Sequence, residues 1–139
     1  METLDLYDLA ERAGIRVDYF DLSGLGSCAV ALDRQCCAIA LDPAMIDTGA
    51  EEKTRLAHEL GHCLTGAFYT RSSPLAVLGK AEYKADRWSV FRLLPFNQLQ
   101  YAIRILDIKK PYELAEHFNV TEALIHKAFD VYKRLGLAL

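Results

Sequence analysis

The chain has 139 residues, of which 52% are hydrophobic and 25% charged, and its formal net charge is −3. This length fits one domain with a sizeable core, and the composition is that of a globular rather than a disordered protein. The net charge excludes a strongly basic nucleic-acid binder whose affinity comes from its overall field. No apolar run approaches the roughly 18 residues that cross a bilayer. The acidic first dozen residues do not resemble a secretory signal, so we expect a soluble, cytoplasmic protein.

The first 45 residues predict a short helix followed by a small sheet. Apolar residues recur at helical spacing before a glycine stop signal: Leu6, Leu9, Ala10, Ala13 and Gly14. Strands are predicted at 15–22, 27–32 and 36–41. The last two are separated only by Asp33, Arg34 and Gln35, which indicates a hairpin. We therefore expect a mainly antiparallel sheet that ends at Asp42-Pro43.

Beyond Glu51 the apolar period becomes helical. One stripe is formed by Leu56, Leu60, Leu64 and Ala67. A loop is predicted at about 69–79, and a second helix runs from about Lys80 to Leu94, where Pro95 ends it. Further helices are predicted at 97–106, 111–118 and 121–135. The expected fold class is α+β, with a small sheet packed on helices.

Four cysteines occur in the chain, and none forms a CxxC pair that would indicate a zinc ribbon or a redox motif: Cys28, Cys36, Cys37 and Cys63. Nothing in the sequence points to an oxidising compartment, so disulfides are not expected. We interpret all four as small buried thiols. Cys63 follows a candidate metal ligand but points about 100° away from it on a helix, which favours a place in the core.

The chemistry is concentrated in His58-Glu59-Leu60-Gly61-His62, an HExxH motif inside a predicted helix. Four residues advance a helix by 400°, so the two imidazoles lie about 40° apart around the axis and roughly 6 Å apart along it. Both can therefore bind one ion from the same face, and neutral imidazole is a good zinc ligand. Glu59 lies beside the first ligand, where its carboxylate can reach a metal-bound water without binding the metal itself.

A catalytic zinc site needs a third protein ligand and an open position. Glu82, at the start of the next predicted helix, is the favoured candidate, and Asp86 lies one turn later on the same face. Asp86 is an alternative ligand, a hydrogen-bond partner of a ligating histidine, or one half of a salt bridge with Arg87 or Lys84. The small Ala85 would let this helix pack closely against the histidine helix. Two histidines and a carboxylate also suit iron or manganese.

The residues HELGH at 58–62, EYKAD at 82–86 and Leu93-Leu94-Pro95 resemble the motifs of the ImmA/IrrE family, which are gluzincin-like zinc metallopeptidases. The resemblance implies that His58, His62 and Glu82 bind Zn²⁺ and that Glu59 is catalytic. It also implies a zincin-like unit over residues 1–96, continuous with a helical cap at 97–139.

Members of that family act in bacterial mobile elements and stress responses, where they cleave or inactivate a helix-turn-helix repressor. The resemblance therefore implies a protein substrate, with a repressor of a phage or mobile element as the expected partner. No membrane contact is expected, and no pattern in the sequence sets the oligomeric state.

The expected reaction is zinc-assisted peptide hydrolysis, in which Glu59 takes a proton from water and delivers it to the leaving amine. Four residues are candidates for a further donor to the oxyanion: Tyr69, Tyr83, Tyr101 and His117. The sheet edge at 27–32 is expected to bind substrate as an added strand. The 69–79 loop is interpreted as an ordinary connector, with a border or lid of the cleft as the alternative.

The C-terminal region supplies a rival hypothesis. Residues 113–121 resemble the first helix and turn of a helix-turn-helix, with Thr121 capping the second helix. Between 101 and 139, however, six Lys plus Arg face five Asp plus Glu, a balance of only +1. A helical cap with an apolar core is favoured over direct nucleic-acid binding, and that core is formed by Ala115, Phe118, Ile125 and Phe129. The alternative function is a zinc-containing regulatory or DNA-associated module with no or vestigial peptidase activity.

Overall fold

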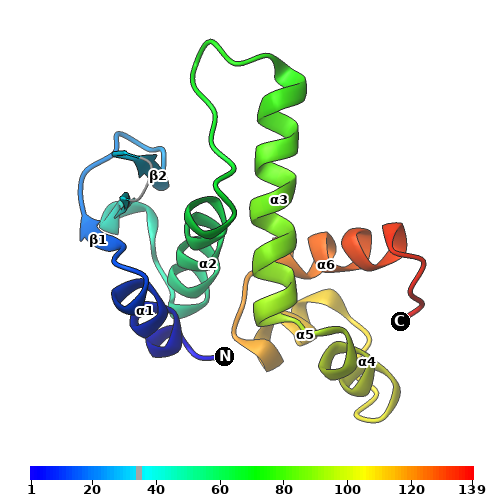
Figure 1. Ribbon diagram of the computed structural model, residues 1–139. Coiled ribbons are helices and arrows are strands. Elements are labelled where there is room, and N and C mark those ends of the chain that lie inside the picture. Colours follow the sequence, from blue (N-terminus) through cyan, green and yellow to red (C-terminus); the bar gives the residue numbers. More distant parts are fainter. Residues whose placement is uncertain (34–35) are drawn as a thin grey trace.

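The computed structural model describes residues 1–33 and 36–139, and it confirms the α+β fold class (Figure 1). The described residues form these elements in chain order: α1 (Thr3–Arg12), β1 (Arg16–Tyr19), β2 (Ser27–Ala31), β3 (Cys37–Leu41), the 3₁₀ helix η1 (Pro43–Met45), α2 (Gly49–Thr65), α3 (Leu75–Leu93), α4 (Phe96–Arg104), α5 (Pro111–Phe118) and α6 (Glu122–Arg134). The sheet lies on one side of α2 and α3 on the other, while α4, α5 and α6 surround the lower end of α3 (Figure 1).

The sheet is mixed, with the strand order β1-β3-β2. The predicted antiparallel pairing of β2 with β3 is confirmed, but β1 pairs with β3 in parallel, so the expectation of a mainly antiparallel sheet is only partly right. Arg34 and Gln35 of the predicted hairpin turn lie outside the described residues. The central place of β3 follows from its burial, because Ile39 and Leu41 are almost fully covered on the side of the sheet that packs against α2. This order leaves β2 at an edge.

Helix α2 begins where the side chain of Thr48 accepts a hydrogen bond from the Glu51 amide, and it ends at Gly66 in the left-handed region. Leu56 and Leu60 are fully buried, as the predicted stripe requires. Leu64, however, is 40% exposed, and Ala67 lies beyond the end of the helix. The buried stripe is therefore one turn shorter than predicted.

Helix α3 begins earlier than expected, at Leu75 instead of Lys80, so the predicted 69–79 loop is shortened to residues 69–74. The reason is Pro74, whose φ of −57° suits the entry to a helix and whose carbonyl accepts hydrogen bonds from the amides of Val77 and Leu78. Residues 75–79 of the predicted loop, which was also considered as a lid, thus belong to the first turns of α3.

Helices α2 and α3 meet at backbone contact. A Cβ added to Gly61 would lie 2.7 Å from the carbonyl oxygen of Ala85 and 2.9 Å from its Cα. Only glycine fits at position 61, and the methyl of Ala85 is itself completely buried. The close packing expected from Ala85 therefore occurs, with Gly61 as its partner.

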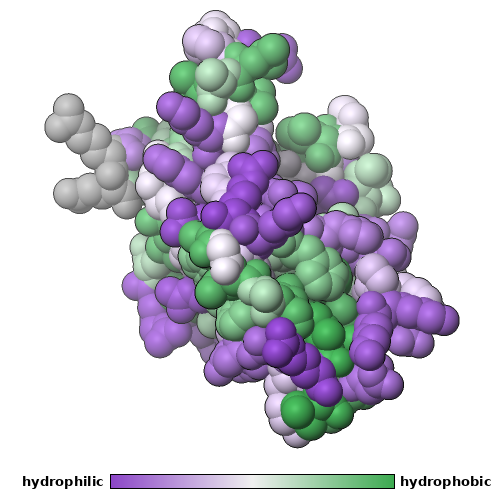
Figure 2. All heavy atoms as spheres, turned by 90° about the vertical axis from the view of Figure 1, so that its right-hand side faces the viewer, coloured by the Kyte–Doolittle hydropathy of each residue, from purple (hydrophilic) through white to green (hydrophobic). Residues whose placement is uncertain are grey.

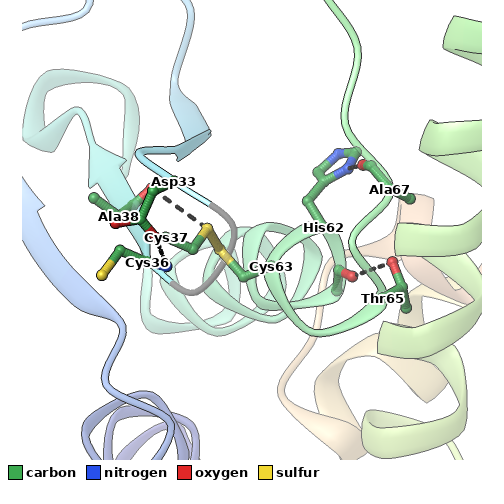
Figure 3. The surroundings of a disulfide bond; sticks show 9 residues. Asp33, Cys36, Cys37, Ala38, His62, Cys63, Thr65 and Ala67 are labelled. Carbon is green, nitrogen blue, oxygen red and sulfur yellow. Dashed lines mark hydrogen bonds between the residues drawn. A yellow bond between two sulfur atoms is a disulfide. The ribbon is translucent and has the colours of Figure 1, made fainter.

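A disulfide joins β3 to α2, between Cys37 and Cys63, with their Cα atoms 5.9 Å apart (Figure 3). The interpretation of all four cysteines as buried thiols is therefore wrong, because Cys36 is also exposed and Cys28 only partly covered. Adjacent residues on a strand face opposite sides, so Cys37 points toward α2 and Cys36 cannot. Cys63 points from α2 toward the sheet, away from the His62 imidazole (Figure 3).

The three C-terminal helices lie close to their predicted positions, and Thr121 caps α6 by accepting from the Leu124 amide. Hydrogen bonds join α5 and α6 to α2: Lys53 Nζ donates to the Phe118 carbonyl at the end of α5, and the Thr121 amide before α6 donates to Thr54 Oγ1. The surface on this side of the molecule mixes hydrophilic and hydrophobic side chains (Figure 2). Among the described residues, no helix combines the length and apolar character that a membrane crossing requires.

The contact at Gly61 leads to a stability prediction. Gly61→Ala should lower the free energy of unfolding by about 1–3 kcal/mol, because the added methyl forces α2 and α3 apart. Gly79→Ala is the matched control: this exposed glycine of α3 has nothing within 4 Å of an added Cβ. It should stabilise the protein by up to about 1 kcal/mol. Urea denaturation of both variants tests this, and equal stability of the two would contradict the packing argument.

Candidate metal centre

Three side chains from α2 and α3 converge on one point. His58 and His62 extend from successive turns of α2, and Glu82 extends from α3. The Glu82 carboxylate places Oε2 3.0 Å from His58 Nε2 and Oε1 3.3 Å from His62 Nε2, and the two Nε2 atoms are 3.2 Å apart. One ligand atom from each residue can be chosen so that all lie within 4.8 Å of one another. These residues could hold a metal ion.

The other nitrogen of each imidazole is engaged by an acceptor. His58 Nδ1 lies 2.8 Å from Asp86 Oδ1, and His62 Nδ1 lies 2.6 Å from the carbonyl oxygen of Ala67. Neither an ionised carboxylate nor a carbonyl can donate, so both Nδ1 atoms carry the proton. In the neutral rings the Nε2 lone pairs then face each other and the carboxylate of Glu82. Three convergent electron-pair donors fit a cation, and two imidazoles with a carboxylate suit zinc among the divalent metals.

The charges of the site reinforce this fit. Hydrogen bonds with His58 and His62 lower the pKa of Glu82 well below its usual range. Burial lowers the pKa of His58, but its hydrogen bonds with Asp86 and Glu82 outweigh burial and raise that pKa to about 9. Burial also lowers the pKa of His62, but its hydrogen bonds with Glu82 and with the Ala67 carbonyl outweigh burial and raise that pKa. A proton and a metal ion compete for the same Nε2 lone pairs, so metal binding should release protons.

Asp86 holds the first histidine in place. Its Oδ1 accepts from His58 Nδ1 and also from Lys127 Nζ, at 3.0 Å, where Lys127 comes from α6. Burial raises the pKa of Asp86, but its hydrogen bonds with His58 and Lys127 outweigh burial and lower that pKa. The expected contact of Asp86 with a histidine is present. Its salt-bridge partner is Lys127, and not Arg87 or Lys84, which were the partners considered from the sequence. No local pattern could have found Lys127, because it lies 41 residues away.

Glu59 is buried beside the three candidate ligands. It is 5% exposed, and its Oε2 accepts a hydrogen bond of 2.7 Å from Ser27 Oγ at the start of β2. The edge strand therefore orients the carboxylate. Sequence reasoning missed Ser27, which lies 32 residues from Glu59 and in no recognisable motif.

Among the four candidate oxyanion donors, Tyr69 is the one that the structure brings to the site. Its hydroxyl donates to Glu82 Oε1 at 2.7 Å, and this bond is the main cause that raises the pKa of Tyr69 to about 12. The other three lie elsewhere: Tyr83 packs beneath the Arg134 guanidinium, Tyr101 is exposed on α4, and His117 contacts Phe118.

The site opens into a cleft of about 1030 Å³. Its walls come from the beginning of β2, the exposed side of α2, the loop after α2, one side of α3 and the first turns of α6. Residues 69–71 thus border the cleft, which was the alternative considered for this loop. Leu124 and Lys127 show that α6 turns part of its surface inward to the cleft.

Comparison of the chain with protein-family models, curated proteins and solved structures finds no match. The ImmA/IrrE resemblance therefore rests on the motif residues of this sequence and stays a prediction.

The metal centre predicts one divalent ion per chain. Protein purified without added metal should contain close to one equivalent of zinc by elemental analysis. The double variant His58→Ala, His62→Ala should contain none, because a single carboxylate from Glu82 cannot hold the ion. Stoichiometric zinc in this double variant would disprove the site assignment.

Asp86 should tune metal affinity without binding the metal. Asp86→Asn should weaken zinc binding by about 10–100-fold in a competition titration with a chelator, because His58 loses its charged partner. Asp130→Asn is the matched control: this exposed aspartate of α6 forms a surface ion pair with Arg134. Equal zinc affinity in both variants would show that Asp86 plays no part in binding.

Proposed function

We propose that this protein is a zinc-dependent endopeptidase. The observation that carries the proposal is the carboxylate of Glu59 beside a three-residue ligand set in an open cleft. Structural zinc sites are usually closed by four protein ligands, whereas catalytic sites keep a position for water or substrate. The described residues contribute three ligands here, and a structural site would have no need for a buried base at Glu59.

The protein's own groups have distinct tasks in this reaction. A bound zinc ion would supply Lewis-acid activation of water and of the peptide carbonyl. Glu59 accepts the proton of the attacking water and later returns it to the leaving amine. Ser27 keeps the Glu59 carboxylate oriented, since its hydroxyl donates to Oε2. The Tyr69 hydroxyl is an O–H donor in the same cleft, and it would be the group to donate to a developing oxyanion.

The edge strand β2 gives the cleft a means of binding extended peptide. One side of β2 pairs with β3, and residues 27–29 line the cleft. A substrate segment that adds to the free edge would form backbone hydrogen bonds independent of its side chains. Strand addition at 27–31 therefore supports cleavage within a chain, which is endopeptidase activity.

We further propose that the substrate is a protein, with a helix-turn-helix repressor of a phage or mobile element as the first candidate. The motif resemblance supports this choice of partner. The rival module, which would act through DNA, is less well supported, because Lys127 of α6 forms an ion pair with Asp86 at the cleft. A recognition helix needs its basic side chains free for phosphates and bases.

The peptidase proposal is tested by Glu59→Gln. This variant should keep one zinc per chain and lose at least about 100-fold in cleavage rate, because the general base is gone while His58, His62 and Glu82 remain. Glu116→Gln, which alters an exposed glutamate of α5, is the control and should cleave at the normal rate. The assay uses the zinc-loaded full chain and a purified candidate repressor.

If Glu59→Gln regulates the repressor as well as the unaltered protein, catalysis is not the function. That outcome would favour the zinc-containing regulatory module.

A further inference from the structure

A basic side chain of α2 also faces the cleft. Arg55 lies one helical turn before His58 and Glu59, and it lines the same cleft while partly buried. Its guanidinium rests on the backbone of Gly26: a Cβ at position 26 would lie 2.7 Å from Arg55 Cζ. Gly26 therefore leaves the space in which this guanidinium sits, directly before Ser27, the partner of Glu59.

The Arg55 guanidinium has no acidic partner among the described residues, since none of their carboxylates lies within ion-pair distance of it. This includes Glu51, which lines the same cleft one turn earlier. A partly buried cation without a partner is unfavourable, because its lost hydration is not replaced. The planar fork of arginine matches a carboxylate with two parallel hydrogen bonds.

The other carboxylates of the centre are already engaged. Glu59 accepts from Ser27, Glu82 contacts both histidines, and Asp86 accepts from Lys127. The cleft therefore presents one uncommitted cation on α2 close to the catalytic centre. An anionic group on the substrate is the natural partner for it.

The contacts between α2 and the sheet give the direction of β2 relative to α2. Arg55 meets Gly26, Glu59 meets Ser27, and Cys63 bonds Cys37, which pairs with the last residue of β2. Helix α2 and strand β2 therefore run in the same direction. Antiparallel pairing is the more stable mode of strand addition, so we take the added peptide to run opposite to β2. In that direction the residues after its cleaved bond lie on the Arg55 side of Glu59.

We propose that Arg55 is a specificity-determining residue that binds a substrate carboxylate one or two residues after the cleaved bond. The carboxylate is supplied by an Asp or Glu side chain or by a free chain terminus. This inference rests on the proposed peptidase function and names the substrate class: peptides with an anionic group on the carboxyl side of the cleavage point.

Binding can be measured without turnover. The probes are short peptides whose amino end carries a zinc-chelating hydroxamate, with either Asp or Asn at the first or second residue and with an amidated or a free C-terminus. The zinc-loaded full chain should bind the best acidic probe about tenfold more tightly than its neutral counterpart, because a charge-assisted bidentate pair is formed. Comparison of Asp with free-terminus probes identifies the source of the carboxylate.

Three variants test the role of Arg55 itself. Arg55→Gln should abolish the preference for the acidic probe, and Arg55→Lys should keep part of it, because a lysine retains the charge but not the fork. Arg71→Gln is the matched control, since it removes the same charge from the loop that borders the cleft, and the preference should persist. Circular dichroism and zinc content confirm that each variant is folded and loaded.

Equal binding of acidic and neutral probes by the unaltered protein would overturn the inference, as would a preference that survives in Arg55→Gln. A zinc-loaded chain that binds none of the probes would also overturn it. Cleavage of a peptide library is the separate test of the proposed function. Cleavage without enrichment of Asp, Glu or a chain terminus after the cut would overturn only the role of Arg55. A preference for the acidic probe without any cleavage would overturn only the peptidase proposal.

Discussion

The contact between Gly61 and Ala85 is the constraint on which the metal centre depends. On α2 the two histidines stand three residues before and one residue after Gly61, and on α3 the two acidic residues stand at the same offsets from Ala85. Residues four apart share one face of a helix, so each pair flanks its own contact residue. A single crossing point therefore sets the separation between the histidine pair and the acidic pair. A methyl group at position 61 would change the distances between the two pairs together, whereas the spacing within each pair is set by its own helix.

Polar bonds then join this two-helix frame to the rest of the molecule. Ser27 links the sheet to Glu59, and Lys127 links the C-terminal helices to Asp86. Each bond ends on a carboxylate beside a candidate metal ligand, so the described parts of the chain outside α2 and α3 orient the site, while α2 and α3 supply the candidate ligands. Among the described residues, no buried side-chain nitrogen or oxygen lacks a hydrogen-bond partner, which indicates that these orientations are well determined.

The sequence predicted what helical periodicity controls. The relation of His58 to His62, and of Glu82 to Asp86, follows from 3.6 residues per turn, which needs no tertiary information. The start of α3 was misplaced because Ser72-Ser73-Pro74 and Gly79 are all loop signals by composition, although only the first group precedes the helix. Local signals could not show that the carbonyl of Pro74 accepts hydrogen bonds from the amides of Val77 and Leu78 and so starts the helix there.

Long-range contacts account for what the sequence could not predict. Ser27, Lys127 and the Cys37–Cys63 bond each bring together segments at least 26 residues apart, and none belongs to a spaced motif. The parallel pairing of β1 with β3 has the same origin, since adjacent strands in sequence normally pair as hairpins and only the burial of β3 on α2 decides its central place.

Net charge and local charge lead to different conclusions about recognition in this protein. The value of −3 disfavours attraction to nucleic acid, and the pairing of Lys127 with Asp86 removes one of the few basic groups of α6 from such a role. The same overall acidity does not disfavour an anionic peptide, because short-range recognition depends on the groups that line the cleft and is little affected by charges beyond about 10 Å. Arg55, which lines the cleft, is partly desolvated and has no acidic partner among the described residues. The net charge is therefore no obstacle to the acidic substrate segment that we propose, which would enter along β2 and meet the guanidinium before it meets the surrounding carboxylates.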